Sequence, residues 1–355
     1  MFSGSVPARM LRTKPRFVFA LAALALAAVA CSNASGIQSK RVQKADVRVA
    51  AGGGVHPLTG VSAFGDQPWQ SRAPLAVKIG NSPAERPQAA LDRADLVYEE
   101  IIEGGVTRFM AVFSTNSAAR VGPVRSVRSV DPILAQPLGA LVAGSGGPRP
   151  ALDDLRSRQG VADVGAKTNG NFYTRDPNRR SPYNLYTATD TIWNARGGSP
   201  PGPQFSFLAS DEDPSSGGEP GTDLGLSFSG TAGQLSFTYD GQSGLYKRSQ
   251  GGSAHMVEGA SGLVQLAFRN VIVQQVTTSM SDIVDQAGQR SVDSNVIGSG
   301  SALVLRGGRV FRGTWQRSSA GEATRFVDAS GQVIKLAPGT TMVELLPQGR
   351  DATVS

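Results

Sequence analysis

The sequence is poor in the residues that form disulfides and metal centres. It has one cysteine and two histidines in 355 residues. No disulfide can form within the chain, and neither a structural metal nor a cofactor is expected. Familiar catalytic signatures are also missing, since there is no G-x-S-x-G elbow, no Walker lysine loop and no H-E-x-x-H motif. The fold must therefore be stabilised by a hydrophobic core, for which 40% hydrophobic residues suffice.

Long hydrophobic runs are scarce, and the longest lies near the start of the chain. Residues 17–30 form an apolar run that is too short to span a bilayer comfortably, and it follows a stretch with four Lys/Arg. This pattern predicts a signal peptide over residues 1–30. Cys31 comes directly after the small residues Ala28, Val29 and Ala30, as in a bacterial lipobox. We expect acylation of the Cys31 thiol, cleavage before it and anchoring to the outside of the cytoplasmic membrane; the alternatives are an ordinary secreted protein and an uncleaved anchor.

Positive charge is concentrated in one part of the mature chain. The formal net charge is +7, but the expected signal peptide holds four of the basic residues and no acid. Residues 104–200 carry twelve Lys/Arg against six Asp/Glu. A nucleic-acid surface would need aromatic residues between these charges, and an extracytoplasmic protein rarely meets nucleic acid. We therefore expect an anionic envelope ligand, not nucleic acid.

Composition divides the mature chain into four parts. Residues 31–72 contain the lipidated cysteine and a polar, glycine-rich stretch that predicts a flexible spacer. Strand-like and helix-like segments alternate over 73–196, whereas short β-rich runs follow one another over 224–350. Residues 197–223 are rich in Gly, Pro, Ser and acids, which predicts a linker. The expected fold class is α+β, with an α/β-type N-terminal domain followed by a mostly-β C-terminal domain.

Within the N-terminal domain, several elements are predicted in detail. The apolar run 74–81 predicts a buried strand, and the runs 95–103 and 106–114 on either side of two glycines predict a hairpin. Residues 140–143 predict a short strand. A helix is expected to open at Pro148, because proline suits a first helical turn.

Two features of this domain predict an anion site. Arg125 and Arg128 lie three residues apart beside a Gly-Pro turn, and their guanidinium forks match carboxylate or phosphate oxygens. Gly144, Gly146 and Gly147 lie between a strand and a helix, where backbone N–H groups and the helix dipole attract anions. The dinucleotide fingerprint G-x-G-x-x-G is absent.

A structural interpretation of the arginines stays open beside the functional one. They could form ion pairs with acids of the same domain, such as Glu99, Glu100 and Glu103. In particular, Glu103 and Arg108 flank the expected hairpin turn and could pair across it.

Candidate catalytic residues are few. Glu103 could serve as a general acid or base, with Tyr183 or Asp176 as the second group. His255 is expected either at a pocket or at a strand edge, hydrogen-bonded to Glu258. His56 falls in the expected spacer, where solvent exposure is expected.

Eight sequence blocks carry a family resemblance: PLTG at 57–60, AVKIGNSPAERPQ at 76–88, ADLVYEEIIEGGVTRFMAVF at 94–113, ARVGPVRSVRS at 119–129, SPYNLY at 181–186, NVIVQ at 270–274, GSGSALVLRGGRVFRGTW at 298–315 and LAPGTT at 336–341. With these blocks the sequence resembles the YerB-like lipoproteins of bacteria, a family of unassigned function. The resemblance implies a surface lipoprotein with an N-terminal and a C-terminal domain, and it implies no reaction. The family commonly has histidine where Tyr183 stands, which weakens a catalytic interpretation of that position.

These observations predict a lipid-anchored envelope protein with an Arg-rich cleft. We expect Glu103, Arg108, Arg125 and Asn184 to converge there and to bind a cell-wall polymer, a glycan phosphate or a peptide carboxylate. One alternative is an envelope hydrolase or transferase that acts on a phosphate- or sugar-containing substrate. Another is a scaffold that binds proteins through a flat apolar patch on the β domain.

Overall fold

The structure is a computed structural model that describes residues 54–284 and 288–355. The expected signal peptide, Cys31 and the spacer up to residue 53 lie outside these residues. All of the described residues belong to one unit. None of the helices in this part of the chain is long and apolar enough to cross a bilayer.

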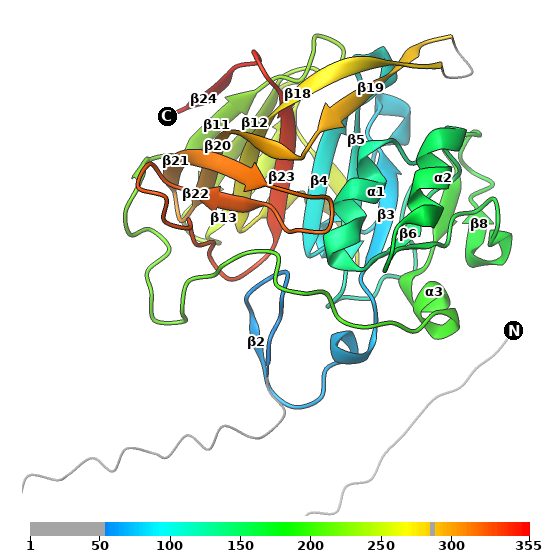
Figure 1. The fold of residues 1–355 in the computed structure, drawn as a ribbon, viewed down its shortest axis with the longest axis horizontal. Helices are drawn as coiled ribbons and strands as arrows, with labels where there is room; N and C mark the ends of the chain where they lie inside the picture. The colour runs from blue at the N-terminus through cyan, green and yellow to red at the C-terminus, as the bar shows by residue number, and fades with distance from the viewer. Residues whose placement is uncertain (1–53, 285–287) are drawn as a thin grey trace, which may run out of the picture. The chain divides into compact units, whose positions relative to one another are not determined.

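One twelve-stranded sheet contains strands from both expected domains (Figure 1). Its order is β10, β21, β20, β18, β23, β4, β5, β3, β6, β7, with β19 beside β18 and β22 beside β21. The N-terminal strands are β3 (Leu75–Gly80), β4 (Leu96–Ile101), β5 (Thr107–Phe113), β6 (Leu141–Ala143) and β7 (Ala162–Asp163). The C-terminal strands are β10 (Glu219–Pro220), β18 (Asn270–Val284), β19 (Arg290–Asn295), β20 (Gly298–Arg306), β21 (Arg309–Arg317), β22 (Arg325–Val327) and β23 (Thr341–Pro347). Strand β23 joins the two sets, because it pairs in parallel with both β18 and β4.

A second sheet packs against one face of the first. Its order is β14, β13, β12, β11, β24, with β17 beside β13. The strands are β11 (Asp223–Leu226), β12 (Leu235–Asp240), β13 (Leu245–Gln250), β14 (Ser253–Ala254), β17 (Ala267–Phe268) and β24 (Ala352–Val354). Short ribbons complete the strands: β1 (Gly54–Val55) with β2 (Ser62–Ala63), β8 (Tyr173–Arg175) with β9 (Leu185–Thr187), and β15 (Met256–Gly259) with β16 (Gly262–Gln265). Phe237 and Phe268 of this sheet share a core with Leu75 and Val77 of β3.

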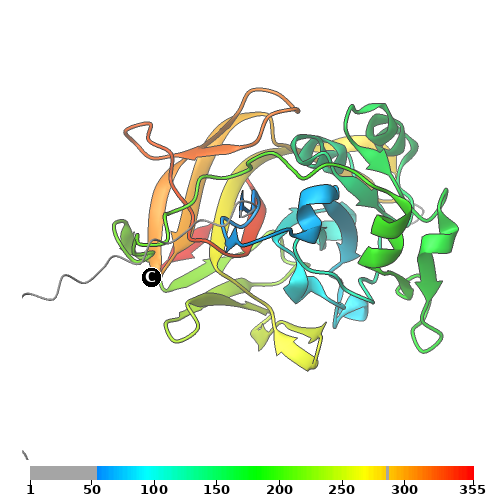
Figure 2. The same ribbon diagram turned by 90° about the horizontal axis from the view of Figure 1, so that it is seen from below.

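Helices cover the other face over the N-terminal strands. These are α1 (Val130–Ala135) and α2 (Arg149–Ser157), which lie in front of β3, β4 and β6 in Figure 1. Ala76 of β3 packs with Val130 and Leu155 in this second core. Seen from below, the second sheet lies on the side opposite these helices (Figure 2). The remaining helical segments are α3 (Thr189–Ala195) and the short 3₁₀ turns η1 (Pro68–Ser71), η2 (Pro83–Glu85), η3 (Leu91–Arg93), η4 (Glu103–Gly105), η5 (Gln136–Leu138) and η6 (Gly170–Phe172).

The predicted local elements are confirmed. The strand expected at 74–81 is β3, the hairpin expected around the two glycines is formed by β4 and β5, and the helix expected at Pro148 is α2. In β3 the side chains alternate between the two cores, since Leu75 and Val77 enter one and Ala76 the other. The α+β class, with few helices and many strands, is confirmed as well.

The expected spacer is not flexible throughout. His56, Leu58 and Trp69 are buried, and the His56 ring bonds the hydroxyls of Thr59 and Ser114. The packed body therefore begins well before Pro74, and the expectation of a solvated His56 is wrong. The physical reason is that a few apolar side chains in a glycine-rich stretch are enough to dock it against the body.

The expected linker also lies against the body. Leu208 is buried and exchanges backbone bonds with the segment at Leu336. Strand β10 pairs with β21, and the Arg306 guanidinium donates to the Ser216 carbonyl at 3.3 Å. The boundaries at 196 and 224 remain predictions, but the two segments that they separate share one sheet.

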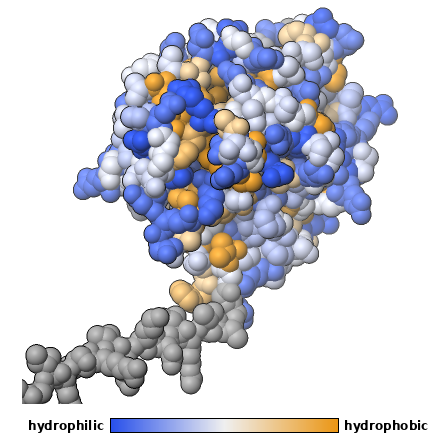
Figure 3. All heavy atoms as spheres, turned by 60° about the vertical axis from the view of Figure 1, so that its left-hand side comes forward, coloured by the Kyte–Doolittle hydropathy of each residue, from blue (hydrophilic) through white to orange (hydrophobic). Residues whose placement is uncertain are grey.

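Figure 3 shows the molecule turned so that the left-hand side of Figure 1 faces the reader. This face mixes polar and apolar residues. Hydrophobic residues form small patches among hydrophilic ones. This face therefore shows no broad apolar area of the kind that a protein-binding scaffold would use.

Candidate functional site

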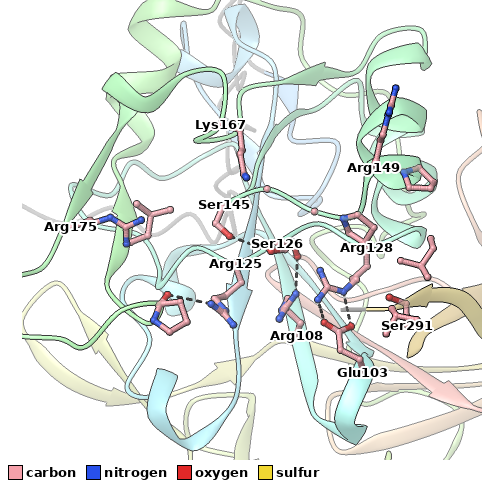
Figure 4. A pocket seen from close by; sticks show the side chains of 18 residues that line it. Glu103, Arg108, Arg125, Ser126, Arg128, Ser145, Arg149, Lys167, Arg175 and Ser291 are labelled. Atoms are coloured by element: carbon pink, nitrogen blue, oxygen red, sulfur yellow. Dashed lines mark hydrogen bonds and ion pairs between the residues drawn. The ribbon is translucent and has the colours of Figure 1, made fainter. Parts of the chain in front are cut away.

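A cavity of about 580 Å³ opens beside the N-terminal strands. Figure 4 shows its lining from close by. The lining contains six basic residues and one acid, Glu103. The basic residues are Arg108, Arg125, Arg128, Arg149, Lys167 and Arg175. Such an excess of positive charge attracts anions.

Arg108 lies on β5, opposite Glu100 of β4. Its side chain is buried, and one terminal nitrogen donates to the Ser126 carbonyl at 3.0 Å. Its Nε has no hydrogen-bond partner, and no carboxylate of the described residues lies within ion-pair distance of the guanidinium. Burial and the neighbouring Arg125 lower the pKa of Arg108 to about 10. A buried cation with an unused donor beside a cavity is costly to the fold unless an anion binds there.

Beneath Arg108 lies a buried cluster formed by Lys78, Glu100 and Asp131. The Lys78 ammonium contacts Glu100 at 2.5 Å and Asp131 at 2.7 Å. Burial raises the pKa of Glu100 to about 7, although Lys78 opposes the shift. Both carboxylates bind Lys78, and their charge also favours the charged form of Arg108, but neither lies within ion-pair distance of its guanidinium.

Glu103 pairs with Arg128, not with Arg108. The Arg128 Nε donates to a Glu103 oxygen at 2.8 Å, and a terminal nitrogen contacts the other oxygen. The expected pairing across the hairpin is therefore wrong. The reason is local: the 3₁₀ turn η4 places Glu103 outside the strand ladder, where Arg108 faces Glu100 instead. Glu103 consequently has both oxygens engaged and offers no free base.

Arg125 is held in place by an acid and an aromatic ring. Its Nε lies 2.6 Å from Glu85, its guanidinium lies over the Tyr183 ring at 5.4 Å, and it donates to the Pro182 carbonyl at 3.3 Å. Tyr183 is therefore next to a lining residue but not in the lining itself. The structural interpretation of the arginines is thus correct in part, since Arg125 and Arg128 both form ion pairs.

The glycine loop lies at the edge of the cavity. Gly146 and Gly147 line it, whereas Gly144 faces a smaller neighbouring cavity. A Cβ on Gly147 would lie 2.6 Å from a methyl group of Val127, so close packing requires glycine there. Helix α2 begins directly after this loop, but Pro148 and Pro150 have no N–H group and the Leu152 N–H donates to the Pro148 carbonyl at 3.1 Å, so the helix start offers fewer donors than the sequence analysis expected.

Several lining residues escaped the sequence analysis. Lys167 lies over Gly146, and Arg175 donates to the Asn184 side chain at 2.7 Å. Asn184 therefore contacts a lining residue but does not line the cavity. The hydroxyls of Ser126 and Ser145, which also line the cavity, lie 3.4 Å apart. The excess of basic residues over 104–200 was the signal that pointed towards Lys167 and Arg175.

His255 lies elsewhere, in a buried polar network. Its Nδ1 accepts from Arg248 and its Nε2 donates to Gln88 at 2.9 Å. Burial and the charge of Arg248 hold the pKa of His255 well below 6.5, so the ring is neutral. The expected bond to Glu258 is wrong, because Glu258 pairs with Arg120.

Metal ligation finds no support in the site. Residues 54–284 and 288–355 contain no group of three or more His, Cys, Asp or Glu side chains that could hold a metal ion.

Comparison with known proteins places the chain in a family. Residues 58–200 match the N-terminal domain, and residues 224–343 the C-terminal domain, of the protein family of unknown function DUF3048. The chain belongs to this family. It is 28% identical, over 84% of its length and 88% of the relative's, to the Bacillus subtilis (strain 168) protein named "Putative lipoprotein YerB". The crystal structure of the YerB protein from Bacillus subtilis matches with a TM-score of 0.70 and 25% identity, covering 84% of this chain and 98% of that one.

Proposed function

We propose that this DUF3048 protein is a lipid-anchored envelope protein whose cavity binds an anionic ligand. The anchor is supported by the position of Cys31 after small residues and by the name of the Bacillus subtilis relative. Ligand binding is supported above all by Arg108, a buried cation with an unused Nε beside the cavity. Anions of the cell envelope, such as phosphate-bearing polymers and glycans, have the required chemistry.

The arrangement favours binding over catalysis. A general base needs a free carboxylate, but Arg128 engages both oxygens of Glu103. Tyr183 and His255, the other candidates, do not line the cavity. The scaffold alternative needs a broad apolar patch, which the face in Figure 3 does not have.

Calorimetric titration of inorganic phosphate into the mature chain tests this proposal. Replacing Arg108 by Met should weaken binding by about 1.5–3 kcal/mol, which is about tenfold to a hundredfold. The same change should lower the melting temperature less than the loss of a paired arginine does, because no carboxylate within ion-pair distance loses its partner.

Arg128→Met is the matched comparison. It should lower the melting temperature, since it leaves Glu103 buried without its cation. The proposal is wrong if Arg108→Met leaves the phosphate affinity unchanged, or if phosphate does not bind to the unmodified protein.

A further inference from the structure

The cavity has cations without carboxylate partners at two depths. Arg108 is buried at the floor, while Lys167 and Arg175 are exposed further out. Within the described residues, neither Lys167 nor Arg175 lies within ion-pair distance of a carboxylate, and Arg175 donates a hydrogen bond to the neutral Asn184. In Figure 4, Ser145 lies between Lys167 and Arg108, and Arg175 lies to one side, apart from Arg108.

Resting on the proposed function, we propose that the ligand is a phosphodiester chain that places successive phosphates at these two positions. One phosphate contacts Arg108 with the hydroxyls of Ser126 and Ser145. The next phosphate contacts Lys167 and Arg175, and the chain then leaves the cavity.

The donors at the inner position favour phosphate over carboxylate. The Arg108 Nε on β5 and the hydroxyls of Ser126 and Ser145 approach from different segments of the chain. A planar carboxylate presents two oxygens in one plane, whereas a phosphate presents oxygens in several directions.

Size and charge favour a chain over a single phosphate. A cavity of about 580 Å³ is as large as those that hold whole small-molecule ligands. Arg128 and Arg125 form ion pairs with Glu103 and Glu85, whereas Arg108 and the outer cations have no carboxylate of the described residues within ion-pair distance. One phosphate at the floor would leave the outer cations unmatched.

Calorimetry with matched probes tests this inference. The probes are glycerol phosphate, a short oligomer of glycerol phosphate joined by phosphodiester bonds, and an oligogalacturonate of equal charge. The protein is the mature chain with Cys31→Ser, which permits work without detergent. The variants are Arg108→Met, Arg175→Ala, Lys167→Ala and, as a control, Arg350→Ala at an exposed arginine outside the cavity lining.

We expect the glycerol phosphate oligomer to bind at least about tenfold tighter than glycerol phosphate, because the second contact is intramolecular. Arg175→Ala and Lys167→Ala should remove most of this gain while changing the affinity for glycerol phosphate less than about twofold. Arg108→Met should weaken the binding of both glycerol phosphate and its oligomer, and Arg350→Ala should change the binding of neither.

Each other outcome has a definite meaning. Equal affinities for glycerol phosphate and its oligomer overturn the two-phosphate inference while leaving the proposed function intact. If oligogalacturonate binds as tightly as the glycerol phosphate oligomer, or more tightly, the choice of phosphate over carboxylate is overturned. Binding of no probe overturns the proposed function itself. Because Arg175 and Lys167 are exposed, their variants should fold, and an unchanged melting temperature verifies this.

Discussion

Replacing Arg248 by Met should destabilise the whole described body, because Arg248 bridges its two family segments. Arg248 of β13 donates to both oxygens of Glu99 on β4, at 3.1 and 2.8 Å, and neither side chain is exposed. Methionine fills similar space without charge. The change leaves Glu99 buried without its cation, next to Glu344 on the neighbouring strand.

The magnitude follows from this burial. Removing one partner of a buried ion pair costs about 3–5 kcal/mol. At roughly 2–4 °C per kcal/mol, the melting temperature should fall by about 6–20 °C. Burial and the nearby Glu99 raise the pKa of Glu344 well above its usual range, so a proton on Glu344 already limits repulsion in the unmodified protein.

Urea unfolding followed by tryptophan fluorescence is the assay. Trp69 and Trp193 report on the N-terminal segment and Trp315 on the C-terminal one, so single-tryptophan variants distinguish the two. Coincident transitions are expected, since one sheet contains strands from both segments.

Arg312→Met is the control for this experiment. Arg312 forms an exposed pair with Glu219, so its loss should cost less than about 1 kcal/mol. A loss of about 1 kcal/mol or less for Arg248→Met would refute the reasoning, as would separate transitions for the two segments.

Three further predictions follow from other sites. Burial, aided by Arg72, lowers the pKa of His56 to about 4. The unfolded chain therefore binds more protons than the folded chain between about pH 6.5 and 4, and the stability falls as the pH falls through that range. His56→Gln should flatten this part of a plot of melting temperature against pH, and an unchanged slope contradicts the prediction. Gly147→Ala should cost about 1–3 kcal/mol in urea unfolding, because its methyl group would meet Val127, and a neutral effect would show that the loop can relax. Cys31→Ala should abolish metabolic labelling by a fatty-acid analogue and partition into detergent, whereas equal labelling of both forms would exclude lipidation there.

Local structure was predictable because its signals are short-range. The apolar run at 74–81, the two β-rich runs around Gly104 and Gly105, and the proline before α2 each define an element within a few residues. The order of strands in the sheet was not predictable. Strand β23 inserts between β18 and β4, and a single sequence contains no pattern that identifies such distant neighbours.

The buried charges illustrate this limit most clearly. Glu99 and Glu100 lie in one central strand and are both buried, although acids are unusual at such positions. Their partners are Arg248, which is 149 residues from Glu99, and Lys78 on β3, which β5 separates from β4. Such pairing depends on the three-dimensional arrangement and leaves no local pattern.

The candidate site was predictable in part. The structure brings Glu103, Arg108, Arg125, Arg128 and the glycine loop to one cavity. Which arginines are already neutralised depends on the positions of the acids. The sequence analysis favoured Arg125 and Arg128, but both form ion pairs. The guanidinium without a carboxylate partner belongs to Arg108, which had been expected to pair with Glu103 across the hairpin.

A crystal structure of the mature protein with bound phosphate, or with tungstate as a heavier analogue, tests the central claim most directly. The account predicts an anion within about 2.7–3.2 Å of the Arg108 Nε, at the floor of the cavity. An anion bound only at exposed Arg149 or Arg175, with the Arg108 Nε bonded instead to a protein oxygen, would contradict it.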